Sequence, residues 1–387
     1  MTASSEPGGT APPHHRRAGR LARGLVIGAV ALAAILASYG AYEYEIHRAP
    51  PGTTPLVIYT YASLFGGNCG SEALTTALAP FAAAHNVAFT FVCPSDLLST
   101  LEAERSAPGA DLVLGLDEVT APVAAADGLL VPYRSPELAN VSGALVNELD
   151  PTHGVTPYEW GYLAVDYSPA FSNATGGAIA HSAFPDFASN STWAKGLLIE
   201  DPTADITGEE FLLWQIEFYT AVLHQDWTTW WKAVAASVPT APDWSTAFDE
   251  FSTDPGRYPM VVSYSSDAAY AAENGAPGSI GTAVTTWNGT SYGWRTVYGM
   301  GIVNGSAHAE LGREFIDWFL GGTVQAAIPT NEWEYPANGT VALPPSFASA
   351  IDATTIVPLD DFTTPAAIAA NLPGYLDEWQ ALENQYG

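Results

Sequence analysis

Aromatic and acidic side chains gather where the predicted strands of this chain end. The aromatic members of this set are Tyr61, Trp160, Trp244, Tyr264, Tyr270, Trp333 and Tyr335. The acidic members are Asp117, Glu159, Asp201, Asp205, Glu332 and Glu334. An aromatic face attracts a cation by about 0.5 to 2 kcal/mol, and carboxylates supply the countercharge. The pattern predicts a site for a flat organic cation, although any single aromatic residue could instead belong to the core or to a lobe interface.

The sequence has none of the short motifs that carry common catalytic chemistry. It lacks the zinc motif H-E-x-x-H, the nucleophile motif G-x-S-x-G and a phosphate loop ending in Gly-Lys-Ser/Thr. It has no Tyr-Tyr dipeptide, a pair that could capture iron. The histidines beyond the N-terminal region lie far apart and lack the short spacing of metal ligands: they are His85, His153, His181, His224 and His308. We therefore expect no catalytic residue, no metal site, no cofactor and no enzyme.

The elements that must position the aromatic and acidic residues follow a strand–helix alternation. Short β-branched and aromatic runs at 56–61, 88–93 and 111–116 predict strands, and 71–85 and 97–105 predict helices between them. This rhythm is typical of a parallel sheet with helices on both faces. In such sheets a ligand lies beyond the carboxyl ends of the strands, where the strand order switches.

The same alternation continues to the end of the chain. Further strands are predicted at 161–165, 196–199, 260–263 and 297–303. Further helices are predicted at 209–224, 228–236, 245–251, 311–320 and 372–383. The sequence has no internal repeat and no second linker, so we expect one unit made of two α/β lobes.

The N-terminus predicts a membrane anchor. Residues 1–23 are polar and carry four arginines, whereas 24–42 contain no charged residue. Nineteen residues at helical rise span about 28 Å, close to the hydrocarbon thickness of a bilayer. Arginines before the apolar stretch place the N-terminus inside and the rest of the chain outside. The alternative is a cleaved signal peptide; in either case, residues 43–55 form a linker.

Composition, the cysteine count and the sequons agree with a location outside the cell. The formal net charge of -29 arises from scarce Lys and Arg, which disfavours a nucleic-acid partner and suits acid, salt or a cell exterior. Two cysteines, Cys69 and Cys93, permit one disulfide, and we expect it because both lie at the carboxyl side of neighbouring predicted strands. Six sequons predict a glycoprotein with exposed loops, at Asn140, Asn173, Asn190, Asn288, Asn304 and Asn338.

From Leu56 to Tyr386 the sequence resembles the thiamine-binding periplasmic proteins of bacterial ABC importers. Ile58-Tyr59-Thr60-Tyr61-Ala62-Ser63-Leu64-Phe65 is similar to the family's Y-T-Y-D-S-F, and the segment 110–117 is similar to A-D-V-V-L-G-L-D. Segments 157–162, 200–203 with 212–214, 243–245 and 262–265 resemble P-F-D-Y-G-Y, Q-D-P-R…L-L-W, G-W-S and L-S-Y-T. The most specific match is Ala327-Ile328-Pro329-Thr330-Asn331-Glu332-Trp333-Glu334-Tyr335-Pro336, close to A-I-P-T-G-N-W-M-Y-P.

The resemblance implies a two-lobed periplasmic-binding-protein fold of the Venus-flytrap type (type II), behind one N-terminal transmembrane helix. Lobe I would comprise 56–157 and 300–387, and lobe II 158–299. The ligand-binding residues implied by the motifs are Tyr61, Asp117, Glu159, Trp160, Asp201, Thr203, Trp244, Tyr264, Tyr270, Trp333 and Tyr335. Two departures concern charge: Ala62 stands where the family has an acid, and Thr203-Ala204-Asp205 stands where it has Arg-Thr-Ser.

The function implied by the resemblance is capture of thiamine or a derivative for delivery to an ABC permease and its ATPase subunit. Two alternatives stay open. The enzyme thiaminase I resembles this fold, so this chain could instead be an enzyme that acts on thiamine. Cys93, at a strand end, would then be the nucleophile, unless it pairs with Cys69. The same fold could also bind another organic cation, such as a polyamine.

Overall fold

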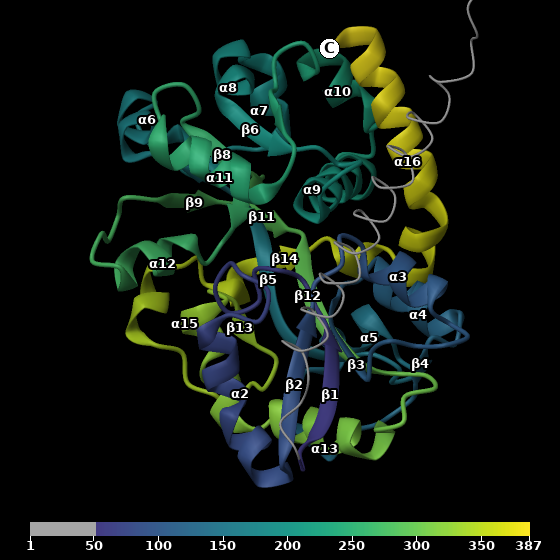
Figure 1. The fold of residues 1–387 in the computed structure, drawn as a ribbon. Helices are drawn as coiled ribbons and strands as arrows, with labels where there is room; N and C mark the ends of the chain where they lie inside the picture. The colour runs from purple at the N-terminus through teal and green to yellow at the C-terminus, as the bar shows by residue number, and fades with distance from the viewer. Residues whose placement is uncertain (1–51) are drawn as a thin grey trace, which may run out of the picture. The chain divides into compact units, whose positions relative to one another are not determined.

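The computed structural model describes residues 52–387, and these begin with the predicted strand–helix alternation (Figure 1). The predicted anchor at 24–42 and the basic segment before it lie outside the described residues. Within 52–387, no helix combines the length and the apolar character needed to cross a membrane.

The first five elements lie close to their predicted positions. They are β1 (Thr54–Tyr59), α2 (Glu72–His85), β2 (Val87–Val92), α3 (Leu97–Ala103) and β3 (Leu112–Leu116). Ser71 begins α2 because its side chain accepts a hydrogen bond from the Leu74 N–H, and Asn86 ends the helix in the left-handed conformation. Asp96 caps α3 in the same way. In the sheet, β1 lies between β2 and β3.

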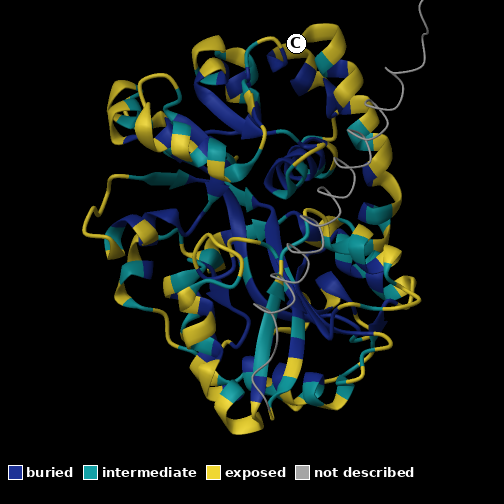
Figure 2. Ribbon diagram, viewed as in Figure 1, coloured by how far each residue is buried: buried dark blue, intermediate teal, exposed yellow. Residues whose placement is uncertain are grey.

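The sheet is mixed, which corrects the expectation of a parallel sheet. The strand order is β2-β1-β3-β12-β5-β8-β6-β7. The two long strands β5 (Thr156–Tyr167) and β12 (Arg295–Val303) pair antiparallel, and β12 is also antiparallel to β3. β8 (Met260–Tyr264) is antiparallel to β5 and parallel to β6 (Leu197–Glu200). The long strands, buried along most of their length, therefore join the two halves of the sheet (Figure 2).

The remaining helices flank this sheet, whereas the short strands either belong to it or form a separate three-stranded sheet (Figure 1). The other helices are α4 (Thr120–Ala126), α5 (Gly143–Leu149), α6 (Pro169–Ala174), α7 (Phe184–Ser189), α8 (Ser191–Gly196), α9 (Ile206–Glu217), α10 (Thr228–Val234), α11 (Trp244–Thr253), α12 (Asp267–Glu273), α13 (Ala309–Phe319), α14 (Gly322–Gln325), α15 (Ile328–Asn331) and α16 (Pro365–Tyr386). The short strands are β4 (Leu130–Val131), β7 (Thr240–Ala241), β9 (Gly281–Ala283), β10 (Thr285–Trp287), β11 (Thr290–Gly293), β13 (Tyr335–Pro336) and β14 (Ile356–Pro358).

Two large apolar clusters form the core. The first surrounds β1, β3 and α13, with Ile58, Leu114 and Phe315 fully buried. The second surrounds α9 and α10 and includes Trp214 and Trp230. The C-terminal helix α16 packs into the second cluster and also against α4. The second cluster thus combines the C-terminal helix with elements from the middle of the chain. The predicted lobe boundaries stay a prediction.

The predicted disulfide between Cys69 and Cys93 is confirmed. It joins the loop before α2 to the residue that follows β2, with the two Cα atoms 5.9 Å apart. These are the only cysteines of the sequence, and neither is free. The bond fastens the loop that begins at Tyr61 to the sheet.

Candidate ligand-binding site

Tyr61 lies just beyond the carboxyl end of β1, against Gly115 of β3. A Cβ atom on Gly115 would lie 2.4 Å from the Tyr61 ring, and the residue has φ +106°, so glycine is required there on both counts. The Tyr61 hydroxyl lies 2.8 Å from Glu159 Oε1 and 2.9 Å from Glu332 Oε2. It also accepts a 3.4 Å hydrogen bond from Tyr158.

Two carboxyl groups lie against this hydroxyl, and the carboxyl of Glu334 lies near both of them. Glu159 comes from β5, and Glu332 and Glu334 flank Trp333 in the segment between α15 and β13. Glu332 Oε1 also accepts a hydrogen bond from the Phe65 N–H. Burial raises the pKa of Glu332 to about 8, and burial together with the neighbouring carboxylates raises the pKa of Glu159 and Glu334 well above the usual range.

Tyrosine rings continue from Tyr61 toward the second half of the sheet. The ring centroid of Tyr298 on β12 lies 5.7 Å from that of Tyr61. The Tyr298 hydroxyl hydrogen-bonds that of Tyr264, which ends β8. Tyr264 in turn lies 6.4 Å from Trp244 and 3.4 Å, hydroxyl to hydroxyl, from Thr207. Tyr298 thus links aromatic residues that pack against different core clusters.

A second row of rings leads back to the starting point. Trp244 stacks on Phe248 at 5.2 Å, and Phe248 lies 6.5 Å from Tyr270. Tyr270 meets Trp333 edge to face at 5.1 Å, and Trp333 follows Glu332 in the chain. Glu332 in turn hydrogen-bonds Tyr61, so the two ends of the row lie near each other. We call its seven residues the aromatic belt: Tyr61, Tyr298, Tyr264, Trp244, Phe248, Tyr270 and Trp333.

Asp205 and Ser263 position Trp244 in the belt. Asp205 caps α9 by accepting from the Thr207 N–H, and its second oxygen accepts from the Trp244 N–H at 3.3 Å. The indole N–H of Trp244 donates to Ser263 Oγ at 3.0 Å, and Ser263 donates to the buried Asp267. Asp205 is therefore committed to backbone N–H groups rather than to solvent.

A second group of carboxyls lies beside the belt, where residues that follow β3 lie near residues of α9. Asp117 caps the turn into α4, because its Oδ1 accepts from the N–H groups of Val119 and Thr120. The fully buried Glu118 accepts from the Trp294 indole N–H at 2.8 Å and lies near Glu210 of α9, whose carboxyl oxygens have no hydrogen-bond partner among the described residues. Burial and the neighbouring Asp117 raise the pKa of Glu118 to about 7. Burial and the same carboxylates raise that of Glu209 to about 8.

Four predicted site residues lie away from the belt. Trp160 follows Glu159 in β5 and so faces the other side of the strand. There it stacks on Tyr335 at 4.9 Å, and both line a separate cavity of about 290 Å³. Asp201 accepts hydrogen bonds from the N–H and hydroxyl of Thr203, which is exposed. Tyr61, Tyr264, Tyr270, Trp244 and Trp333 are brought together, with Glu159 adjoining them.

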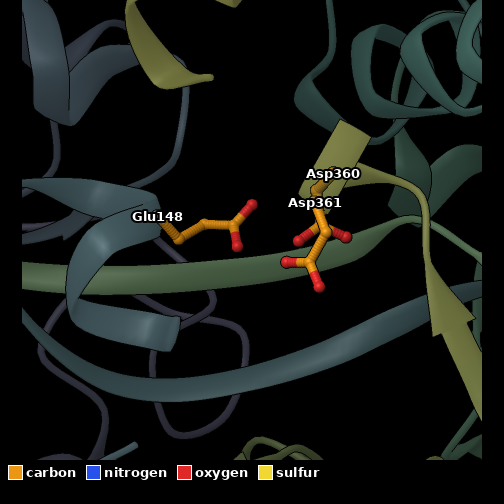
Figure 3. A group of neighbouring side chains, drawn as sticks. All are labelled: Glu148, Asp360 and Asp361. Atoms are coloured by element: carbon orange, nitrogen blue, oxygen red, sulfur yellow. The ribbon is translucent and has the colours of Figure 1, made fainter. Parts of the chain in front are cut away.

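One acidic group has the spacing of a cation site. Glu148, Asp360 and Asp361 lie within 4.8 Å of one another through their carboxylate oxygens (Figure 3). Arg295 already occupies their midst: its Nη2 lies 2.5 Å from Asp360 and 2.9 Å from Asp361 and also contacts Glu148. The guanidinium supplies the countercharge, so we assign no metal there.

Two residues of the belt were not predicted from the sequence. Tyr298 lies inside β12 between Val297 and Gly299, and Phe248 lies inside α11. Neither is at a strand end, which was the signal used to collect candidates. Period-two alternation along β12 could have placed Tyr298 on the side of the sheet that carries Glu159, its register partner on β5.

No family model matches the sequence. A thiamine-binding periplasmic protein of Escherichia coli K12 is 26% identical over 329 residues, 84% of this chain and 92% of the relative. One of Salmonella typhimurium is 28% identical over 330 residues, with the same coverage.

Solved structures extend the similarity to the fold. A periplasmic thiamin binding protein gives a TM-score of 0.71 at 23% identity over 87% of this chain and 98% of that one. An iron- and citrate-bound protein of Trichodesmium gives 0.64 at 15% identity over 85% and 99%. The resemblance stated from the sequence is confirmed: the chain has the two-lobed periplasmic-binding-protein fold and is similar over most of its length to thiamine-binding periplasmic proteins.

Proposed function

We propose that this chain is the extracytoplasmic solute-binding protein of an ABC importer and that it captures thiamine, or a thiamine derivative, between its two lobes. The observation that carries this proposal is the aromatic belt. Seven rings form one row whose two ends, Tyr61 and Trp333, meet at Glu332, and no described Lys or Arg forms an ion pair with Glu159, Glu332 or Glu334. A flat cation is the ligand that such a surface favours, through ring quadrupoles and countercharge.

Within this proposal the ligand contacts are assigned by position. Tyr61, Tyr264, Tyr270, Trp244 and Trp333 offer ring faces or hydroxyls, and Tyr298 joins them. Glu159 supplies negative charge. Asp117 stabilises the turn beside the belt and adds to the negative electrostatic potential of the site. Trp160, Tyr335, Asp201 and Thr203 become contacts only if the lobes move relative to this arrangement, as lobes of binding proteins do.

The protein carries no cofactor and works by binding rather than by chemistry. A thiaminase-like reaction would need Cys93 as a free thiolate. The Cys93 sulfur is instead bonded to Cys69. A polyamine is the remaining alternative ligand, since it is also cationic, although it offers no flat ring to stack on the belt.

The proposed partners are an ABC permease and its ATPase subunit, which would receive the ligand. Residues 24–42 would hold the protein to the cell membrane as a single-pass anchor, with the N-terminus inside and the binding lobes on the extracellular face. The Arg-rich segment before 24–42 and the linker after it support this topology.

The sequons differ in their accessibility for glycosylation. Asn140, Asn173, Asn288 and Asn304 are exposed, and Asn190 is half-buried. Asn338 is buried, and its amide Nδ2 donates to the Leu320 carbonyl at 2.8 Å. We therefore propose the exposed asparagines as glycan sites and expect Asn338 to stay unmodified in the folded protein.

Calorimetry on residues 54–387 tests the proposal. We expect this fragment to be soluble and monomeric, because both core clusters lie within it, and to bind one thiamine per chain. Spermidine serves as the competing ligand. Absence of thiamine binding, or tighter binding of spermidine, would refute the assignment of thiamine.

A further inference from the structure

Two buried carboxyl groups near the Tyr61 end of the belt, those of Glu159 and Glu334, each have an oxygen without the donor that a buried carboxylate needs. Glu159 and Glu334 are 1% and 5% exposed, and the Oε2 atom of each has no hydrogen-bond partner among the described residues. A buried acceptor without a donor is costly and calls for an explanation. No described Lys, Arg or His forms an ion pair with Glu159, Glu332 or Glu334.

The geometry around Tyr61 requires a proton on one of these carboxyls. The hydroxyl has one hydrogen, yet it lies within 2.9 Å of oxygens from both Glu159 and Glu332. It can donate to one of them and must accept from the other, which then carries the proton. The other titratable groups facing the three carboxyls are Tyr158, Tyr264, Tyr335 and Asp267, and none of them supplies positive charge.

Two of the three carboxyls are particular to this sequence. The motif that the segment 327–336 resembles has Asn and Met on either side of its Trp, where this chain has Glu332 and Glu334. The acid of the first motif is missing at Ala62. Glu332 reaches the same neighbourhood from the other end of the chain, through Tyr61 and the Phe65 N–H. The charge lost at 62 is thus restored by a different segment.

We propose that Glu159, Glu332 and Glu334 receive the positive charge of the ligand, that Glu332 and Glu334 set the preference for a cationic over a neutral ring, and that capture releases a proton. This inference rests on the proposed function and specifies it. When the cation enters, the carboxyl that shares a hydrogen bond with Tyr61 loses its proton to solvent. The ligand's charge replaces that proton, so the total charge of the site is unchanged.

The test compares thiamine with 3-deazathiamine, in which a carbon replaces the charged ring nitrogen. Calorimetry uses the full chain in mild detergent, wild type and the variants Glu332→Gln and Glu334→Gln. Glutamine keeps the size of each side chain and an acceptor for the Phe65 N–H. Glu378→Gln, at an exposed position on α16, is the matched control. Thermal melting of each variant confirms that it is folded.

We expect thiamine affinity to fall by about tenfold or more in each of the two variants, as for loss of a buried charge partner. Affinity for the neutral analogue should change by less than about threefold. Measured in two buffers of different ionisation enthalpy, wild-type binding should release close to one proton at about pH 7, where the raised pKa values of Glu332, about 8, and of Glu159 allow either carboxyl to hold it.

Equal losses for both ligands, or no proton release, would overturn the inference and leave thiamine binding itself intact. A wild-type protein that binds neither ligand would overturn the proposed function as well. The two failures are therefore distinguishable in one experiment.

Discussion

Replacing Trp333 by alanine should weaken thiamine binding strongly while leaving the fold intact. Trp333 is half-buried between Glu332 and Glu334 and meets Tyr270 edge to face at 5.1 Å. Removing its ring loses a cation–π contact of about 1 to 2 kcal/mol. It also loses roughly 50 Å² of apolar stacking, worth about 1.2 kcal/mol. The sum of about 2 to 3 kcal/mol corresponds to a dissociation constant raised about 30- to 150-fold.

The backbone at this position makes the substitution a clean one. Trp333 has φ +61°, in the left-handed region, and alanine meets the same backbone strain there as tryptophan. Stability should therefore change little, since the side chain is not fully buried. Calorimetry with thiamine measures the loss, and Trp287→Ala, another partly exposed tryptophan on β10, is the control. A dissociation constant within about threefold of wild type would refute the reasoning and remove Trp333 from the site.

Three further predictions follow from the same structure. The ligand-free protein should be most stable in acid. Burial raises the pKa of Glu118 to about 7 and of Glu332 to about 8; their contribution to the free energy of unfolding is therefore complete below the pKa of an unfolded Glu, about 4.3, and is lost as the pH rises to about 8. A melting temperature that rises over this pH range would contradict the prediction. Replacing Cys69 and Cys93 by serine should cost roughly 3 kcal/mol, because the disulfide closes a loop across a separation of 24 residues. The double variant should still bind thiamine without degrading it. Unchanged stability in chemical denaturation would contradict the stabilisation by the disulfide, and degradation of thiamine by the native protein would favour an enzyme. Thiamine should bind more tightly than thiamine diphosphate, because Asp205 caps α9 where a phosphate would need free N–H groups or a base; calorimetry showing the reverse order would refute this.

Local signals in the sequence predicted the elements and much of the belt. Helix 71–85 is marked by Ser71 at its start, and the structure has that serine as the cap of α2. Tyr61, Trp244 and Tyr264 follow strand ends or short turns, so the rule that ligands lie at carboxyl ends of strands was enough to select them. The disulfide followed from the two cysteines alone.

Pairings between distant segments could not be predicted in this way. The antiparallel pairing of β5 with β12 makes the sheet mixed, and it joins residues more than a hundred positions apart. The same pairing sets Tyr298 beside Glu159, and the strand ends alone do not reveal it. Some local evidence was available but was not used. Glu159 and Trp160 are neighbours in one strand and face opposite sides, and Asp117 precedes Thr120 in the pattern of a turn cap.

The central claim is that this chain captures thiamine. Mass spectrometry of the small molecule released from residues 54–387, purified without added ligand and then denatured, tests it most directly. We expect intact thiamine or one of its derivatives, in a ratio approaching one per chain. A polyamine or another unrelated compound in that ratio would show that the protein captures a different ligand.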